Sequence, residues 1–572
     1  MELTTATDSS DDGQFNHEVT ASADAPTRRA RGPRVPGWTV LAAITALIIV
    51  GPLVALPASF VGGDALFDPL ARELLPRALR TSVFLAFGVG VGTLLLGGGL
   101  ALLISFWDFP GRRLLDWALV LPLAMPGYVL VFVTLGQYGL ASPLQSNLFG
   151  DGLQIPGLRT PVGAICILTG VLYPYVYVLG RSAFLGQSRQ SLDAARSLGL
   201  TYGQSVRRIA FPLARPALAA GVALAVMEAL ADFGTVNLLG VQALTNAIYR
   251  IWNGAFDENG ALQLATVLLT LTLLLVLVER LMRGRARYNQ ALGHGDAVTP
   301  LRLRGWRAWL AAIPGWALLL VVFFLPVTQL VAWSAETIAD NTTVPNLGAA
   351  TRNTAMLGVI TAIVAILVAT TLVYGERTRP TRAGKLLTRL TTVGYAIPGT
   401  VVAVAVYSPL VWVDRHIIDA ADSAGVSITL LFTGTILGLI IAYIIRFNAL
   451  AFFSVEARMT RIDTNLDDAA RSLGADRTRV LTDVHMPLLR PGIIAAALLV
   501  MVEVMKELPA TALLRPLGFD TLAITVWEAT KDSRLDAAAL PALLIVLIGL
   551  VPVIVLVRLL RAEGWTAAAD HF

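Results

Sequence analysis

Long apolar runs alternate with short polar segments along most of this chain of 572 residues. Many of the runs exceed about 18 residues, enough for a helix to cross the hydrocarbon core of a bilayer. Only 15% of the residues are charged, against about 25% in soluble proteins. The pattern predicts an all-α integral membrane protein with about twelve transmembrane helices. The expected spans lie roughly at 38–60, 80–105, 114–138, 161–183, 216–240, 261–280, 309–333, 353–375, 388–413, 428–453, 491–515 and 538–560.

The first 36 residues follow a different pattern. They are polar without an apolar period, acidic at first and then rich in arginine. We therefore expect residues 1–36 to form a disordered tail. The first apolar run begins near Trp38 and is about 23 residues long, which favours a spanning helix over a signal peptide.

The basic residues indicate the orientation of the chain. Placing the N-terminus inside puts most of the 44 Lys and Arg residues in segments that face the cytoplasm, which is the usual bias of membrane proteins. Both termini are therefore expected to be cytoplasmic. The segment 282–308 is rich in arginine and is expected to be a cytoplasmic linker.

One polar stretch occurs twice, each time between apolar runs. Asp193–Gly199 reads Asp-Ala-Ala-Arg-Ser-Leu-Gly, and Asp468–Gly474 has the same seven residues. After twelve further residues, Pro212-Leu-Ala-Arg-Pro216 matches Pro487-Leu-Leu-Arg-Pro491. At a constant offset of 275, 11 of these 24 positions are identical. Both copies lie on the predicted cytoplasmic side.

The repetition extends to two homologous six-helix halves. Met125-Pro126-Gly127 matches Ile397-Pro398-Gly399, and Arg80-Thr81-Ser82 matches Arg352-Asn353-Thr354. Two halves with the same order of spans form a parallel repeat around a path along the membrane normal. The expected organisation is the tail at 1–36, a first helix with its outer loop at 37–75, a first transmembrane domain at 76–281, the linker at 282–308, a helix with its outer loop at 309–347, a second transmembrane domain at 348–560 and a C-terminal tail at 561–572.

Locally, the repeated stretch predicts two short helices joined by a tight turn. Ser191 is expected to cap the first helix, and Gly199 to end it in the left-handed conformation. Thr201, like its counterpart in the second copy, is expected to cap the second helix. Pro212 would end that helix and Pro216 would start the next span. The motif would present its small residues to a partner; an ordinary interfacial loop is the alternative.

This arrangement resembles the EAA coupling motif in the permease subunits of bacterial ABC importers. The resemblance implies the type I permease fold, a place in the bacterial plasma (inner) membrane, and loops that insert into clefts on two separate ATPase subunits. This sequence carries Asp where the family usually has Glu, which keeps the charge with a shorter reach. The residues implied in coupling are Asp193, Ala194, Ala195, Gly199, Pro212 and Pro216, with Asp468, Ala469, Ala470, Gly474, Pro487 and Pro491.

The sequence carries no ATP-hydrolysing motif of its own. A P-loop needs Gly-Lys followed by Ser or Thr, and none of the three lysines, Lys385, Lys506 and Lys531, has that context. We therefore expect a transport subunit without catalytic residues or a cofactor, and ATP hydrolysis by a partner subunit.

Charged residues within the fifth and eleventh predicted spans are candidates for lining a path. The offset of 275 aligns Glu228 with Glu503 and Asp232 with Glu507, and Lys506 lies among them. Ionised groups at membrane depth cost several kcal/mol unless they face a cavity or a partner. Residues four apart share a helix face, and the lysine would neutralise part of the acidic cluster. A structural set of ion pairs is the alternative to a path or gate.

The same segments carry a finer resemblance. Ala231-Asp-Phe-Gly-Thr-Val236, Ile248-Tyr-Arg-Ile-Trp252, Lys506-Glu-Leu-Pro-Ala-Thr511 and Leu514-Arg-Pro-Leu-Gly-Phe-Asp-Thr-Leu522 are similar to the fused permeases of ferric-iron ABC importers. The resemblance covers about residues 75–560. It implies transport of ferric iron, although thiamine permeases share the fused layout.

The sequence shows no iron chemistry of its own. Cys166 is the single cysteine, and we expect no metal site in the chain. The histidines are scattered over loops and tails at His17, His294, His416, His485 and His571. The resemblance implies that an extracytoplasmic binding protein captures the metal and delivers it to the outer mouth. Importers of thiamine or another small solute, a secondary transporter and a membrane enzyme remain as alternatives; no nucleic-acid partner is expected.

Overall fold

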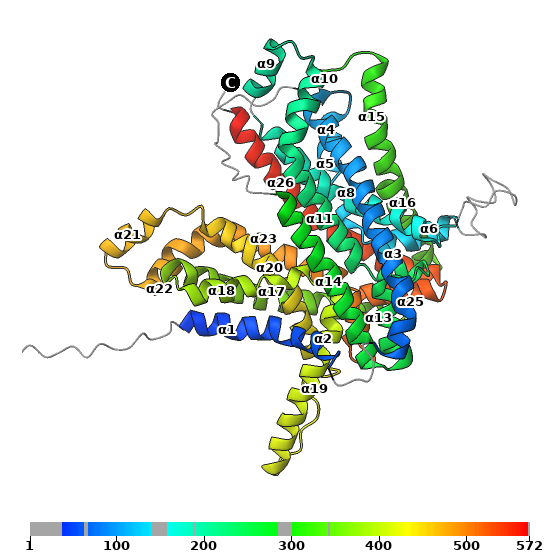
Figure 1. Cartoon of the computed structure of the whole chain (residues 1–572), viewed down its shortest axis with the longest axis vertical. Coiled ribbons are helices and arrows are strands. Elements are labelled where there is room, and N and C mark those ends of the chain that lie inside the picture. The colour runs from blue at the N-terminus through cyan, green and yellow to red at the C-terminus, as the bar shows by residue number, and fades with distance from the viewer. Residues whose placement is uncertain are drawn as a thin grey trace, which may run out of the picture.

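The structure is a computed structural model that describes residues 37–61, 67–138, 157–187, 189–283, 300–340 and 344–569. Helices make up nearly all of its elements (Figure 1). Within the described ranges, 11 helices are long and apolar enough to span a membrane, and a bent helix pair raises the number to as many as 12. The predicted all-α membrane fold is confirmed. The predicted tail at 1–36 and linker residues 284–299 lie outside the described residues.

Three long helices form the centre of the first half. Helix α8 (Pro161–Leu185) packs between α3 (Pro69–Thr93) and α11 (Phe211–Ala231), and α14 (Glu258–Arg283) covers α11 from the other side. Helix α4 (Gly99–Phe106) continues α3 after a π-helical turn, so that Pro69–Phe106 forms one span.

The second half repeats this arrangement. Helices α17 (Leu347–Thr378), α20 (Ile436–Met459) and α23 (Met486–Lys506) pack against one another. Helix α26 (Leu535–Ala569) packs on the short α25 (Leu522–Lys531) and on α23. Since α26 continues to Ala569, most of the predicted C-terminal tail is helical.

A matching pair of hydrogen bonds shows that the halves are equivalent. The Ser82 hydroxyl accepts the backbone N–H of Leu244 at 2.9 Å, and the Thr354 hydroxyl accepts that of Leu522 at 2.9 Å. Each bond satisfies the first N–H group of a short helix, α13 (Leu244–Arg250) in the first half and α25 in the second. The triplets that match in the sequence therefore do the same structural work in both halves.

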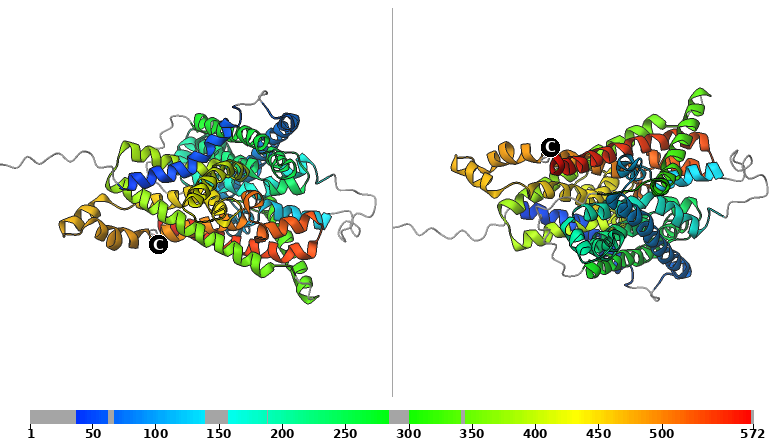
Figure 2. Two further views of the ribbon diagram at one scale, coloured as in Figure 1. Left: turned by 90° about the horizontal axis from the view of Figure 1, so that it is seen from below. Right: turned by 90° about the horizontal axis from the view of Figure 1, so that it is seen from above.

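The first helix of each half packs against the other half. Helix α1 (Gly37–Val50) lies on α17 and α18 (Arg382–Leu390) of the second half (Figures 1 and 2). Helix α15 (Trp306–Leu319) packs on α4 and α5 (Arg112–Ala118) of the first half. This exchange joins the two halves into one body.

Beside α15, a two-residue parallel strand pair ties the chain after the linker to the first half. Strand β1 (Trp107–Asp108) follows α4, and β2 (Leu301–Arg302) precedes α15. The pairing places the end of the span Pro69–Phe106 next to the start of α15.

Two predicted spans are interrupted at proline, which changes their bounds. The span at 114–138 consists of two segments, Arg112–Ala124 and Gly127–Gln137, which meet at an angle of 92°. In the span at 388–413, helix α19 (Gly399–Ser423) begins only after Pro398 and extends ten residues beyond the predicted end. Proline lacks a backbone N–H and disfavours the helical conformation in the residue before it, so the Pro-Gly repeats mark breaks.

Two other predicted spans end early, at acidic residues. The span at 216–240 ends as a helix at Ala231, and α12 (Gly234–Leu238) follows it. The span at 491–515 ends at Lys506, and α24 (Pro509–Leu514) follows. The residues after these ends, Asp232 and Glu507, have extended backbone conformations.

Close approach of helices around α8 depends on glycine. A Cβ at Gly97 would lie 2.5 Å from the carbonyl oxygen of Tyr173, whereas a Cβ at Gly99 would meet no atom within 4 Å. We expect Gly97→Val to destabilise the protein by about 1–3 kcal/mol, because overpacking forces backbones apart. Gly99→Val is the matched control and should leave thermal unfolding in detergent nearly unchanged. Equal melting temperatures of the two variants would contradict the packing described here.

Candidate functional site: two helix–turn–helix motifs and a central charged cavity

The first repeated stretch forms two short helices around a left-handed glycine. Helix α9 (Arg189–Ser197) ends just before Gly199, which has φ +90°. The N–H of Leu200 returns to the Ala195 carbonyl at 3.2 Å, a bond typical of a glycine C-cap. Thr201 caps the next helix in a reciprocal capping box with Gln204. The predicted turn and this cap are confirmed; Ser191 lies within α9 and not at its cap.

The second copy has the same geometry. Helix α21 (Thr464–Ser472) is capped by Asp463, and Gly474 follows it with φ +86°. Asp476 then caps the following helix by accepting the N–H of Arg479 at 2.8 Å. Both motifs project from the body of the molecule, where α9 and α21 stand at the ends of their halves (Figure 1).

The surface of each motif combines a charge with an exposed leucine. Asp193 pairs with Arg196 at 3.6 Å, and Asp468 with Arg471 at 3.2 Å. Leu198 and Leu473 are 84% and 89% exposed, which the sequence analysis did not single out. A leucine beside a left-handed glycine in a polar loop is a signal that could have marked them.

The small residues are only partly exposed, contrary to the prediction. Ala194 and Ala469 are exposed and Ala470 is half-buried, but Ala195 is buried under the motif. Ala195 lies on the side of α9 that packs against the first half, whereas Ala194 and Leu198 face outward.

The prolines of the motif do not end or start helices as predicted. Tyr202–Ala231 runs through Pro212 and Pro216 as one span of 30 residues, and Arg477–Lys506 runs through Pro487 and Pro491 in the same way. A π-helical turn precedes each first proline, at Val206–Ala210 and Val480–His485. Such a turn widens the helix locally, which accommodates the N–H that proline lacks.

The two motifs are anchored by different chemistry. In the second, Asp467 is buried and accepts hydrogen bonds from Arg377 Nε at 2.9 Å and from His485 Nε2 at 2.7 Å. At the offset of 275, Asp467 corresponds to Leu192 and His485 corresponds to Ala210, and both of these residues of the first half are apolar and buried. Burial alone would raise the pKa of Asp467, but hydrogen bonds from Arg377 and His485 outweigh it and lower the pKa below its ordinary value. Its stabilising effect is therefore present at neutral pH and lost only in acid.

A cavity of about 120 Å³ lies at the contact between the halves. Helices α8, α11, α20 and α23 line it, together with the break at Pro126-Gly127 and the break at Glu507-Leu508-Pro509. The structure brings all the predicted path-lining candidates to this cavity and adds one cation. Its charged lining residues are Glu228, Asp232, Arg446, Glu503, Lys506 and Glu507.

Arg446 is the charged residue that sequence analysis left out of the site. It pairs with Glu507 at 3.0 Å and is almost completely buried. Lys506 pairs with Glu503 at 2.9 Å on the same helix, as its spacing suggested. A single arginine in the middle of the tenth predicted span was the available signal, since such a residue needs a partner.

The sequence analysis predicted that Asp232 would share a helix face with Glu228, and Glu507 with Glu503. This prediction is wrong, because both helices end before the second carboxylate. Each of these carboxylates follows the last residue of its helix and accepts backbone N–H groups of the next short helix. Asp232 accepts from Thr235 N at 2.9 Å, and Glu507 from Ala510 N at 3.0 Å. Both carboxylates thus stabilise a helix break as well as facing the cavity.

The glycine of each Pro-Gly break makes room for one of these carboxylates. A Cβ at Gly127 would collide with the hydroxyl of Thr235, which donates to Asp232, and would lie 3.3 Å from Asp232 Oδ2. A Cβ at Gly399 would collide with the Arg446 guanidinium and lie 2.5 Å from Glu507 Oε1. The Pro-Gly pairs that match between the two halves therefore pack against the acidic residues that match between the two halves.

Comparison with known proteins agrees with this geometry. A family model, "binding-protein-dependent transport system inner membrane component", matches residues 93–287 and 362–562, once in each half. An Fe(3+)-transport system permease protein of Haemophilus influenzae is 27% identical over 541 residues, covering 91% of this chain and 98% of that protein.

Two further relatives match only part of the chain. A probable molybdenum ABC transporter permease protein of Haloferax volcanii is 31% identical over 40% of this chain and 84% of its own length. A sulfate transport system permease protein of Salmonella typhimurium is 27% identical over 46% of this chain and 97% of its own length. With the family model matched in both halves and over more than half of its length, the chain belongs to the family of inner membrane components of binding-protein-dependent transport systems.

Proposed function

We propose that this permease carries ferric iron across the membrane for an ABC importer. The observation that supports this substrate is the charge of the central cavity, where four carboxylates face two cationic groups. A lining in which acidic groups outnumber basic ones favours cations over oxyanions. One relative that covers nearly the whole chain is named for Fe(3+) transport, and a second of equal coverage is named only as a probable ABC transporter permease protein. The molybdenum and sulfate permeases match less than half of the chain.

In this proposal the energy comes from two separate ATPase subunits. Each would receive one helix–turn–helix motif, with Gly199 or Gly474 at its tip and Leu198 or Leu473 beside it. Both termini would be cytoplasmic, and an extracytoplasmic binding protein would deliver iron to the opposite side. The supporting observations are the twofold motif with one geometry and the family of the chain.

A continuous helix connects each motif to the cavity. Tyr202–Ala231 and Arg477–Lys506 each contain 30 residues, so each is about 45 Å long at 1.5 Å per residue. Each begins at the turn of its motif and ends one residue before Asp232 or Glu507. When the ATPases close, movement of the motifs would be carried along these helices to the carboxylates and would open the cavity to one side or the other.

Stimulation of ATP hydrolysis tests the substrate. Purified alone, the permease should hydrolyse no ATP. In proteoliposomes with its ATPase subunits, it should support hydrolysis that rises several-fold with a binding protein loaded with ferric iron, since loaded receptor favours the closed ATPases. The same receptor without iron is the control. Stimulation by a receptor loaded with sulfate, molybdate or thiamine, and none by iron, would reject the substrate and leave the importer class intact.

Neutralising the cavity carboxylates tests their part in the path. Asp232→Asn and Glu507→Gln keep a carbonyl oxygen for the helix break but remove a charge, so uptake per folded molecule should fall about ten-fold, the equivalent of about 1.4 kcal/mol. Asp116→Asn is the matched control, because Asp116 pairs with Arg181 away from the cavity. Folding is measured as the monodisperse fraction in detergent. If both cavity variants transport at the normal rate per folded molecule, these carboxylates have only a structural role.

Substitution of the two turn glycines tests the coupling of the motifs to the ATPase subunits. A Cβ at Gly199 or Gly474 would meet no atom within 4 Å, so only the positive φ opposes a side chain. A left-handed conformation costs a non-glycine residue about 1–2 kcal/mol, and Gly199→Val with Gly474→Val should abolish uptake while membrane insertion stays normal. Gly203→Val is the control, because Gly203 is equally open but lies in α10 (Tyr202–Ser205) without a positive φ. Uptake near normal in the double variant would refute the coupling role.

A further inference from the structure

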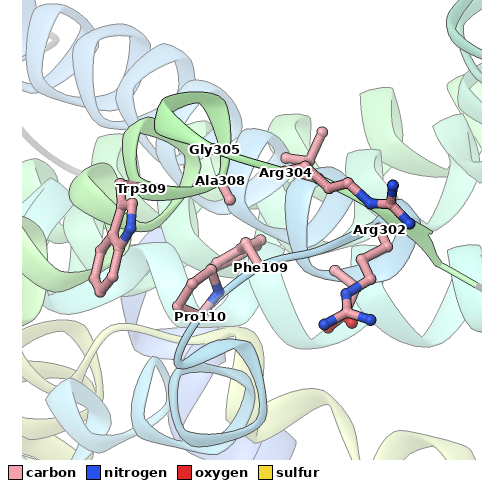
Figure 3. Close-up of a pocket in the computed structure, with 9 residues that line it drawn as sticks. Phe109, Pro110, Arg302, Arg304, Gly305, Ala308 and Trp309 are labelled. Carbon is pink, nitrogen blue, oxygen red and sulfur yellow. The ribbon is translucent and has the colours of Figure 1, made fainter.

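A second and larger cavity lies outside the transport site, where the chain re-enters the body after the linker. It has a volume of about 690 Å³ and lies between the segment after α4 and the start of α15. Arg302 and Arg304 line one side of it, Trp309 lines the other, and Phe109 and Pro110 lie between them (Figure 3). The position corresponds to the cytoplasmic ends of two spans in the proposed orientation.

The charged groups of this pocket are not neutralised within the described part of the chain. Arg302 and Arg304 are exposed, and among the residues that the structure describes neither forms an ion pair. Arg307 lies next to them with its guanidinium 5.9 Å from the Trp306 ring centre. Asp108 is the one acidic residue of the lining. The pocket therefore offers two free guanidinium groups, which bind phosphate oxygens well.

An apolar surface begins directly below the arginines. From α15 into the π-helical turn that follows it (Leu320–Phe324), the exposed residues include Trp309, Ile313 and Leu320, which are 65%, 55% and 50% exposed, while Ala308, Ala312 and Leu319 face the protein and are buried. The exposed residues recur at helical spacing, so they form one stripe along the span. Tryptophan near the end of such a stripe is typical of the membrane–water interface.

The other half shows that this exposure is specific to α15. Trp38 is the second residue of α1 and follows Gly37, and Trp306 is the first residue of α15 and follows Gly305. Trp38 packs into the second half against Gly375 and Gly384, where any side chain would collide with its ring. Trp306 is 68% exposed instead. At the same point of the repeat, protein packs on one tryptophan and leaves the other exposed.

We propose that the pocket between Asp108–Pro110 and Arg302–Trp309 binds the headgroup of an anionic phospholipid, whose acyl chains lie along the exposed stripe of α15. The arginines would hold the phosphate group, and the apolar stripe below them distinguishes a lipid from a soluble phosphate. A soluble anion would use the arginines but would leave the stripe uncovered. The site is separate from the cavity that carries the transported solute, so the proposal is independent of the nature of that solute.

A bound headgroup would also brace the first coupling motif. The N–H of Leu303 donates to the Asp108 carbonyl at 2.9 Å, so the two edges of the pocket are joined. The Trp107 ring packs edge-to-face on Tyr202 at 6.3 Å, and the Tyr202 hydroxyl donates to the Phe106 carbonyl at 3.0 Å. Tyr202 is the first residue of the long helix that begins at the coupling turn. A lipid that clamps both edges would hold the base of that helix.

Binding is measured with the full-length permease in nanodiscs or detergent, by native mass spectrometry with dioleoyl phosphatidylglycerol and with dioleoyl phosphatidylcholine. Wild-type protein should retain the anionic lipid preferentially. Each arginine near an anionic lipid strengthens binding about five-fold, so Arg302→Gln with Arg304→Gln should weaken it about thirty-fold. Arg379→Gln with Arg382→Gln is the matched control, because both are exposed arginines in the connection of the second half that corresponds to the Asp108–Pro110 segment. It should retain wild-type binding.

A variant that is expected to strengthen lipid binding separates the proposed effect from misfolding, which would only weaken binding. Asp108→Asn removes the acidic lining group and should strengthen retention of phosphatidylglycerol about five-fold. Equal retention of both lipids by the wild type, or an equal loss in the control pair, would overturn the proposal. So would full displacement of the lipid by millimolar inorganic phosphate, because the pocket would then be a site for a soluble anion.

Discussion

The rest of the structure depends on how Asp232 and Glu507 are held at the point where two long helices end. Carboxylates inside a membrane protein are costly unless hydrogen bonds or cations satisfy them. Here each one replaces the missing helical hydrogen bonds by accepting N–H groups of the next short helix. Each helix break supplies N–H groups to a buried carboxylate, and each carboxylate satisfies N–H groups that the break leaves without a helical partner. The breaks and the acidic groups therefore stabilise one another.

Several other features follow from these two breaks. The Pro-Gly bends at Gly127 and Gly399 leave space for the carboxylates, which a side chain at either glycine would occupy. Arg446 supplies the cation that Glu507 needs. Asp232 has the hydroxyl of Thr235 at 3.0 Å in addition to backbone groups. The same fold thus gives the two halves carboxylates in equivalent places with different partners, which gives the cavity between them an asymmetric charge distribution.

The long helices that end at the carboxylates also connect two distant parts of the molecule. Each runs without interruption from a helix–turn–helix motif to the cavity, although two prolines lie in its first part. The π-helical turns before Pro212 and Pro487 keep the helix continuous. A continuous helix transmits displacement, whereas a helix ended at proline would leave a flexible joint between the motif and the cavity. The anchoring differs between halves, because a buried network of Asp467, Arg377 and His485 replaces the apolar contacts of Leu192.

The sequence by itself determined the features that depend on local pattern. Apolar runs of spanning length, the bias of basic residues and the repeat at an offset of 275 were enough for the class of fold and its two halves. The left-handed turns at Gly199 and Gly474 and the cap at Thr201 were also predictable, because backbone dihedrals and capping hydrogen bonds involve residues only a few positions apart. Tertiary structure decided what depends on distant partners. The pairing of Arg446 with Glu507 joins residues 61 positions apart, and the packing of Asp232 and Thr235 against Gly127 also joins segments that are distant in the sequence. A hydropathy pattern records that a residue is apolar or charged, but the partner that satisfies it is set only when the helices pack.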